Sequence, residues 1–139
     1  MKSNNIHSEV LHLIPELINI EVTLMAGKST YEINDSSLEA SKVIGIFMRS
    51  PVAGRKTKSG AAFPAANVFQ CGFLNILDGN KQIINSMPLE MLQTANGEYV
   101  KVNFQNGIGM NNCKVVFSDA ATPQNSTGLE IIFVIERNC

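Results

Sequence analysis

Apolar and polar side chains alternate along several short stretches of the chain. The clearest stretch is residues 18–24, where Ile18, Ile20, Val22 and Leu24 are separated by polar residues. Because successive side chains of a strand point to opposite faces, this period of two predicts a strand with one wet face. Alternating or continuously apolar runs predict further strands at residues 30–33, 42–48, 68–77, 81–85, 99–104, 113–117 and 129–136.

Residues that favour turns separate these stretches. Asp78-Gly79 lies between two apolar runs and predicts a hairpin, because a type I′ turn needs positive φ at both central residues. Residues 86–92 predict a short helical turn, with Pro88 near its first position. Residues 1–17 are predicted as an arm or a short helix, since Pro15 would end any helix begun at residue 8.

About eight short strands and little helix predict an all-β fold. We expect an antiparallel two-sheet sandwich that forms one domain over residues 1–139. Eight strands favour the jelly-roll type. A seven-stranded immunoglobulin-like sandwich remains the alternative, although the chain has no Trp to mark its core.

Two of the predicted strands, 42–48 and 129–136, are apolar on both faces. A two-layer sandwich has one inner face per sheet, so the other face of these strands needs a cover. A loop, the chain's own N-terminal segment or a neighbouring subunit could supply it. If a subunit does, the outward residues Ile132 and Val134 are the predicted interface residues.

Composition and charge limit the classes of partner and the cellular compartment that the sequence predicts. The chain is 45% hydrophobic and 17% charged, with a formal net charge of -1, so no overall field attracts nucleic acid or an anionic membrane. No run of 18 apolar residues predicts a membrane span, and the N-terminus lacks the apolar core of a signal peptide. The three cysteines predict no disulfide framework. We expect Cys71 and Cys113 to be small buried residues in strands and Cys139 to be exposed.

Residues 49–67 predict a flexible basic loop. Its centre, G-R-K-T-K-S-G, does not match a phosphate-binding P-loop, because no glycine stands at the required spacing before the lysine and no helix-forming segment follows. The loop is then either a solvated connection or a basic arm that contacts packaged nucleic acid or an acidic neighbour. Its candidate contact residues are Arg49, Arg55, Lys56 and Lys58.

No set of residues predicts catalysis, a cofactor or a metal. The two histidines, His7 and His12, lie near the N-terminus and cannot supply a cupin-type metal site or a hydrolytic triad. The carboxylates are scattered, so an enzyme is predicted only if two of them converge in the fold. A module that binds a small molecule or carbohydrate is a further hypothesis, although two tyrosines and no tryptophan offer few aromatic platforms.

Three stretches carry a resemblance to a class of proteins: I-N-I-E-V-T-L with K-V-I-G-I-F, then M-P-L-E-M-L, and finally T-G-L-E-I-I-F-V-I-E. In outline the chain resembles small jelly-roll virion structural proteins of bacteriophages. The resemblance implies a non-enzymatic capsid, decoration or spike-base subunit that assembles with itself and with other virion proteins. It also implies assembly in the host cytoplasm, residence in the virion, and contact of the basic loop with packaged nucleic acid or an adjoining subunit.

Overall fold

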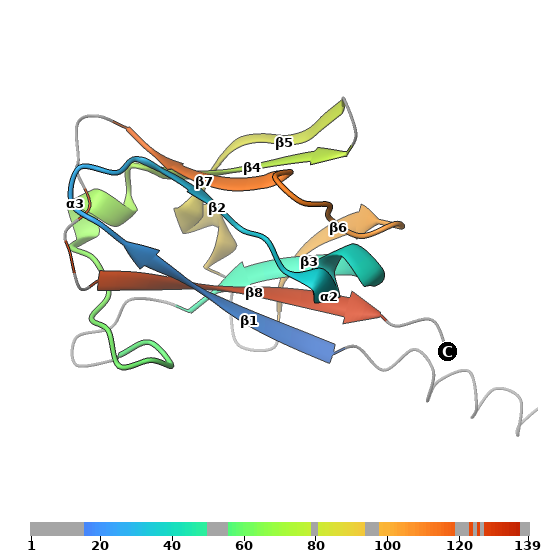
Figure 1. The fold of residues 1–139 in the computed structure, drawn as a ribbon, viewed down its shortest axis with the longest axis horizontal. Helices are drawn as coiled ribbons and strands as arrows, with labels where there is room; N and C mark the ends of the chain where they lie inside the picture. Colours follow the sequence, from blue (N-terminus) through green and yellow to red (C-terminus); the bar gives the residue numbers. More distant parts are fainter. Residues whose placement is uncertain are drawn as a thin grey trace, which may run out of the picture.

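Eight β-strands form two four-stranded antiparallel sheets in the computed structural model, which describes residues 16–49, 56–78, 81–93, 98–118, 123, 125 and 127–136 (Figure 1). This confirms the prediction of an all-β, two-sheet sandwich. The elements in chain order are β1 (Glu16–Leu24), β2 (Thr30–Glu32), α2 (Ser36–Ala40), β3 (Lys42–Met48), α3 (Ala66–Phe69), β4 (Gly72–Asp78), β5 (Lys81–Pro88), η1 (Leu89–Leu92), β6 (Val100–Phe104), β7 (Cys113–Phe117) and β8 (Thr127–Glu136).

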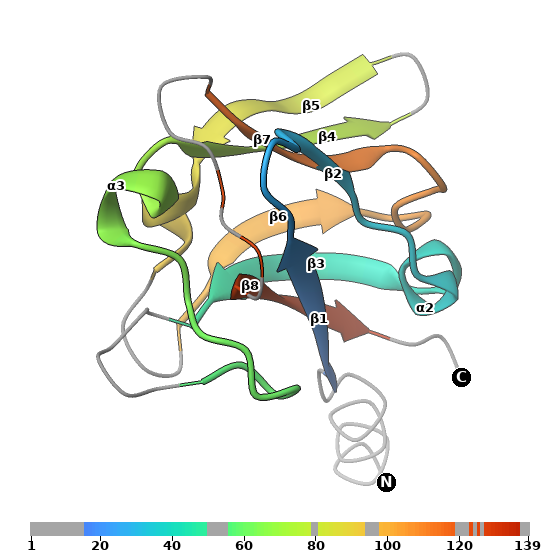
Figure 2. The ribbon, with the colours of Figure 1, turned by 60° about the vertical axis from the view of Figure 1, so that its left-hand side comes forward.

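The strands follow one simple pairing rule. The first sheet has the order β1-β8-β3-β6 and the second sheet the order β2-β7-β4-β5. Strands β1 and β8, β2 and β7, β3 and β6, and β4 and β5 therefore pair, so the chain is a long hairpin whose turn lies between β4 and β5. Successive pairs alternate between the two sheets, which wraps the hairpin into two layers (Figure 2).

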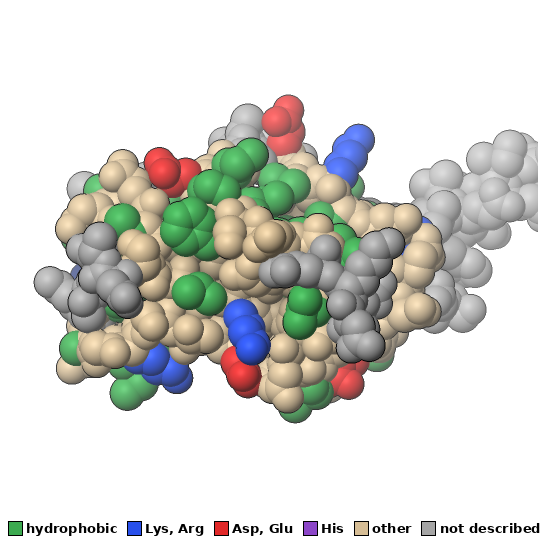
Figure 3. Space-filling model, turned by 90° about the horizontal axis from the view of Figure 1, so that it is seen from above, with side chains coloured by type: hydrophobic (Ala, Val, Ile, Leu, Met, Phe, Trp, Pro, Cys, Tyr) green, Lys and Arg blue, Asp and Glu red, His purple; other side chains and the backbone are tan. Residues whose placement is uncertain are grey.

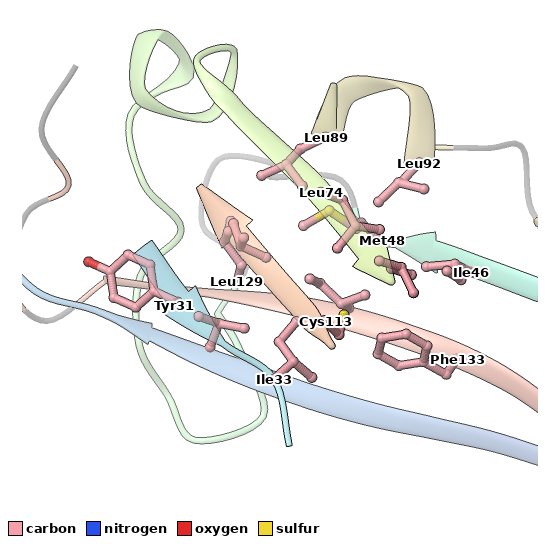
Figure 4. Packing of buried hydrophobic residues seen from close by; sticks show 14 of the residues in the cluster. Tyr31, Ile33, Ile46, Met48, Leu74, Leu89, Leu92, Cys113, Leu129 and Phe133 are labelled. Atoms are coloured by element: carbon pink, nitrogen blue, oxygen red, sulfur yellow. The ribbon is translucent and has the colours of Figure 1, made fainter. Parts of the chain in front are cut away.

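The core lies between the layers, where the inward residues of both sheets meet (Figure 4). Leu74 of β4 and Phe133 of β8 have no exposed surface. Each such side chain contributes about 1.5–3 kcal/mol by leaving water. Tyr31 and Phe117 pack edge to face with ring centroids 6.0 Å apart. Cys113 is also fully buried, and burial raises the pKa of its thiol to about 12.

The predicted strand at 68–77 begins later than the pattern indicates. Residues 66–69 form α3, and β4 starts at Gly72. Val68 and Phe69 are adjacent and both buried, which a helical turn allows and a half-exposed strand does not. Cys71 consequently precedes the strand and is only partly buried, so its predicted place in a strand is wrong.

Local turn-forming residues, Asp35 and Pro88, directly precede the other two short helices. Helix α2 begins between two of the predicted strands, because the Asp35 side chain accepts a hydrogen bond from the Ser37 backbone N–H at 2.8 Å and caps the helix. The predicted turn after Pro88 is η1, whereas residues 86–88 belong to β5.

Among the described residues, no helix combines the length and apolar character required to cross a membrane.

Several predictions fall wholly or partly outside the described residues. These are the arm or helix over residues 1–17, of which 16 and 17 prove to be the start of β1, and the turn at Gly79 within the β4–β5 hairpin, whose strands do pair. Arg55, His7, His12 and Cys139 also lie outside.

Candidate functional site

Within the basic loop, residues 56–62 fold into a small hairpin. Lys56 and Ala62 form an antiparallel bridge, and the Thr57 N–H donates to the Ala61 carbonyl at 2.9 Å. Gly60 adopts φ 92°, which glycine tolerates, at the tip. The Gly128 N–H donates to the Ala62 carbonyl at 2.9 Å, so this loop hairpin is attached to the beginning of β8.

Glu21 of β1 holds the tip of the loop hairpin. Its carboxylate accepts hydrogen bonds from the Thr57 hydroxyl at 2.8 Å, the Ser59 N–H at 3.1 Å and the Ser59 hydroxyl at 2.5 Å. Slight burial disfavours the charged form, but the hydrogen bonds from Ser59 and Thr57, with the charge of Lys58, outweigh it and lower the pKa of Glu21. The carboxylate is therefore ionised, with several donors, at neutral pH.

Glu130 of β8 is a fully buried carboxylate beside this contact, with 0% of its surface exposed. Arg49 Nη1 donates to Oε1 at 2.5 Å, and Asn19 Nδ2 donates to Oε2 at 2.6 Å. Arg49 also donates to the Lys56 carbonyl at 3.3 Å, which links the ion pair to the loop hairpin. Burying an ion is unfavourable unless it is paired and hydrogen-bonded, and these donors meet that need.

Glu21 and Glu130 are direct cross-strand partners in the β1–β8 register. Like charges directly opposite one another destabilise a sheet unless each has its own compensation. Here Glu21 takes its donors from the loop hairpin, and Glu130 takes them from β1 and from Arg49. We call this group, Asn19, Glu21, Arg49, Thr57, Ser59 and Glu130, the carboxylate cluster.

The carboxylate cluster brings two carboxylates together, which is the arrangement that the sequence analysis required for an enzyme. Its known contacts are to protein donors, which hold the loop hairpin against the sheet. Asn19 Oδ1 is buried without a hydrogen-bond partner among the described residues. Within that part of the chain, no group of three or more His, Cys, Asp or Glu side chains could hold a metal ion.

The structure places the predicted basic residues in different surroundings. Arg49 is paired with Glu130, and its side chain is 35% exposed. Lys58 is exposed, yet its Nζ donates to the Asn19 carbonyl at 2.5 Å. Lys56 is exposed at the base of the loop hairpin. Of these three cations, two therefore have acceptors within the protein, and contact with nucleic acid remains a prediction.

Ile132 and Val134 do lie on the outward side of β8, but they are only 7% and 1% exposed. Val134 neighbours Gly45 of β3, and a Cβ at Gly45 would lie 1.9 Å from Tyr99 Cδ1. The Tyr99 ring thus lies over the strand beside Val134. In the monomer these two residues present little surface to a partner, and their role in an interface remains a prediction.

A cleft of about 280 Å³ opens between the edge strands of the two sheets. Its walls include Ile20 and Val22 of β1, Tyr31 and Glu32 of β2, and Lys28 from the connecting turn. Lys28 Nζ lies 5.1 Å from the centroid of the Tyr31 ring, a cation–π distance. The cleft thus combines apolar side chains with charges of both signs.

The outer face of the second sheet carries apolar side chains (Figure 3). They occupy outward positions on three neighbouring strands, because they alternate with buried residues such as Leu74, Ile76 and Val115. None of them is fully buried, and Ile83 is 45% exposed. We call them the apolar face: Phe73, Leu77, Ile83, Pro88 and Val116.

Sequence reasoning missed the carboxylate cluster as a unit. The available signal was Glu130, a charged residue inside the apolar run L-E-I-I-F-V-I-E. A charge in a strand that is buried on both sides needs a partner, and Arg49 follows the other two-sided strand directly.

Comparison with protein-family models, curated protein sequences and solved structures finds no match.

Proposed function

We propose that the protein is a non-enzymatic structural subunit that acts by self-assembly. The pairing of β1 with β8, β2 with β7, β3 with β6 and β4 with β5 supports a sandwich of the jelly-roll type, in which an eight-stranded hairpin wraps into two sheets. The subunit would serve in a virion as a capsid, decoration or spike-base protein that assembles in the host cytoplasm with itself and with other virion proteins. The exposed Lys56 and Lys58 would offer cations to packaged nucleic acid.

The single observation that carries self-assembly is the apolar face. In an antiparallel sandwich, polar residues that face water normally alternate along each strand with apolar residues that face the core. Here Phe73 pairs across the sheet with Val116 on one side and with Pro88 on the other, so three apolar positions adjoin. Contiguous exposed apolar surface marks a site of protein contact.

The experiment measures association over a range of concentrations by analytical ultracentrifugation. We expect the wild-type protein to self-associate and Ile83→Lys to weaken association at least tenfold, because the lysine must lose water in the contact. Met110→Lys is the matched control, since Met110 is 56% exposed and lies in a turn outside the apolar face. A wild-type protein that stays monomeric at the highest concentration, and has no partner in its source particle, would refute the proposal.

The cleft between β1 and β2 favours a second candidate function, the binding of a small molecule or carbohydrate. Its volume of about 280 Å³ is near the lower end for ligand pockets, and Lys28 and Glu32 could orient a polar ligand. A thermal-shift and glycan-array screen tests this function. A true ligand at one hundred times its Kd should stabilise the protein by about 2.7 kcal/mol, and Glu32→Gln or Lys28→Ala should abolish the effect.

A further inference from the structure

Among the described strands, β1 is an edge strand of the first sheet, with β8 paired to one side of it and no strand paired to the other. The Gly128 N–H donates to Ala62, away from β1, so the Thr23–Gly128 pair is not a hydrogen-bonded pair of the β1–β8 ladder. Because hydrogen-bonded and non-bonded pairs alternate and this register has no bulge, the same holds for Leu17, Asn19 and Glu21. The backbone N–H and C=O groups of these four residues therefore point to the outside of the first sheet.

The sequence of this edge is compatible with its own antiparallel copy. β1 has nine residues, E-L-I-N-I-E-V-T-L, with Ile20 at the centre. A two-fold axis at Ile20 would set Ile18 opposite Val22 on the inner side and Asn19 opposite Glu21 on the outer side. No like charges oppose one another in this register, and the outward-pointing groups would form about eight hydrogen bonds.

Some apolar side chains on the inner side of β1 are incompletely buried. Val22 and Leu24 are 7% and 0% exposed, whereas Ile18 and Ile20 are only partly buried. Ile20 also lines the cleft between β1 and β2. A strand added along β1 would lie at the mouth of this cleft and cover both isoleucines. An exposed edge strand of this length is a template for pairing with another chain.

We propose that two copies of this chain pair through β1, antiparallel about a two-fold axis at Ile20, so that their first sheets join into one continuous sheet. This inference rests on the proposed self-assembly and adds an interface distinct from the apolar face. An extended assembly needs more than one kind of contact, and a self-complementary edge supplies the two-fold one.

The loop hairpin controls access to this edge. Lys58 Nζ donates to the Asn19 carbonyl, and the same oxygen would accept from the Glu21 N–H of the second copy. Lys58 must therefore swing away when the strands pair. Lys58→Ala removes this competitor and should strengthen dimerisation by three- to tenfold.

Cysteine cross-linking tests the register, in a background with Cys71→Ala and Cys139→Ser so that buried Cys113 is the remaining native thiol. Across the two-fold axis the two copies of residue 20 form a non-bonded pair with Cα atoms about 4.5 Å apart, which a disulfide can span. Ile20→Cys should therefore form a disulfide-linked dimer under mild oxidation. In Val22→Cys the two thiols lie about 14 Å apart along the strands and should not link, nor should Ile18→Cys. Mixing the Ile18→Cys and Val22→Cys proteins should restore linkage.

Light scattering on the same samples separates the two proposals. If the protein associates but Ile20→Cys does not link, or Val22→Cys alone links as readily, pairing through β1 is overturned and self-assembly stands. If the protein is monomeric throughout, both fail. Thr23→Pro is the second variant, because its lost N–H points to the free edge and leaves the β1–β8 ladder intact. It should weaken dimerisation at least tenfold with the circular dichroism of the wild type, and unchanged dimerisation would contradict the inference.

Discussion

Replacing Arg49 by methionine should destabilise the protein strongly, because it leaves a buried carboxylate without its cation. The substitution keeps most of the aliphatic stem and removes the guanidinium that donates to Glu130 at 2.5 Å. Glu130 has no exposed surface and would retain the hydrogen bond from Asn19. Charge-to-alanine substitution would mix this effect with lost packing, which methionine avoids.

The magnitude follows from burial. Breaking a fully buried ion pair costs about 3–5 kcal/mol, but the Arg49 side chain is 35% exposed, so water can partly replace it. A hydrogen bond to a charged group contributes about 1.5–3 kcal/mol. We therefore expect a loss of about 2–3 kcal/mol for Arg49→Met. With an unfolding entropy of about 2.1 cal/mol/K per residue, this lowers Tm by about 7–10 °C.

Urea denaturation followed by circular dichroism measures this loss, with Lys42→Met as the control. Lys42 pairs with Glu136 at 3.7 Å, and both side chains are partly exposed, so its loss should be below about 1 kcal/mol. Adding Glu130→Gln to Arg49→Met should recover at least half of the stability, because the uncompensated charge is gone. An Arg49→Met loss no larger than that of Lys42→Met, or no recovery in the double variant, would refute the reasoning.

Three further outcomes are expected. The pKa of Glu21 is lowered in the folded protein, so the stability that it contributes is complete above its ordinary pKa of 4.5 and is lost as pH falls through the folded value; urea midpoints across this range should show the loss, and Glu21→Gln should flatten it. Gly45→Ala should lower stability by about 1–3 kcal/mol, because its Cβ displaces the Tyr99 ring, and Tyr99→Ala should remove most of this difference in thermal unfolding. Iodoacetamide at pH 8 should label Cys71 and spare Cys113, whose pKa is about 12, until denaturant exposes both.

Local pattern predicted the strands well where one residue in two faces the core. In β7 the buried residues Cys113, Val115 and Phe117 alternate with half-buried ones, and its bounds agree with the sequence because Asn112 and Ser118 favour turns on either side. The bounds of β3, whose run is apolar on both faces, agree as well. The prediction was wrong at α3, where adjacent buried residues Val68 and Phe69 imitate a fully buried strand. A short apolar run does not by itself distinguish these two structures.

The carboxylate cluster could not be predicted in this way, because it depends on register between distant strands. Asn19 and Glu130 are 111 residues apart in the chain. A shift of one residue between β1 and β8 would turn Glu21 and Glu130 to opposite faces. The sequence pattern indicates which side chains lie on the same face of each strand. The pairing of β1 with β8, however, is decided by the packing of the whole sandwich.

The two-sided apolar pattern of β8 has a physical origin that sequence reasoning only partly anticipated. β8 lies between β1 and β3, so neighbours flank it on both sides within the first sheet. On its outer side the loop hairpin reaches Gly128, and the ring of Tyr99 lies beside Val134. These described parts of the chain lie against this face, whereas the predicted N-terminal cover falls on residues outside the described range. Ile132 and Val134 therefore expose little surface, whereas Ile18 and Ile20 of β1 and Ile83 of the apolar face are more exposed.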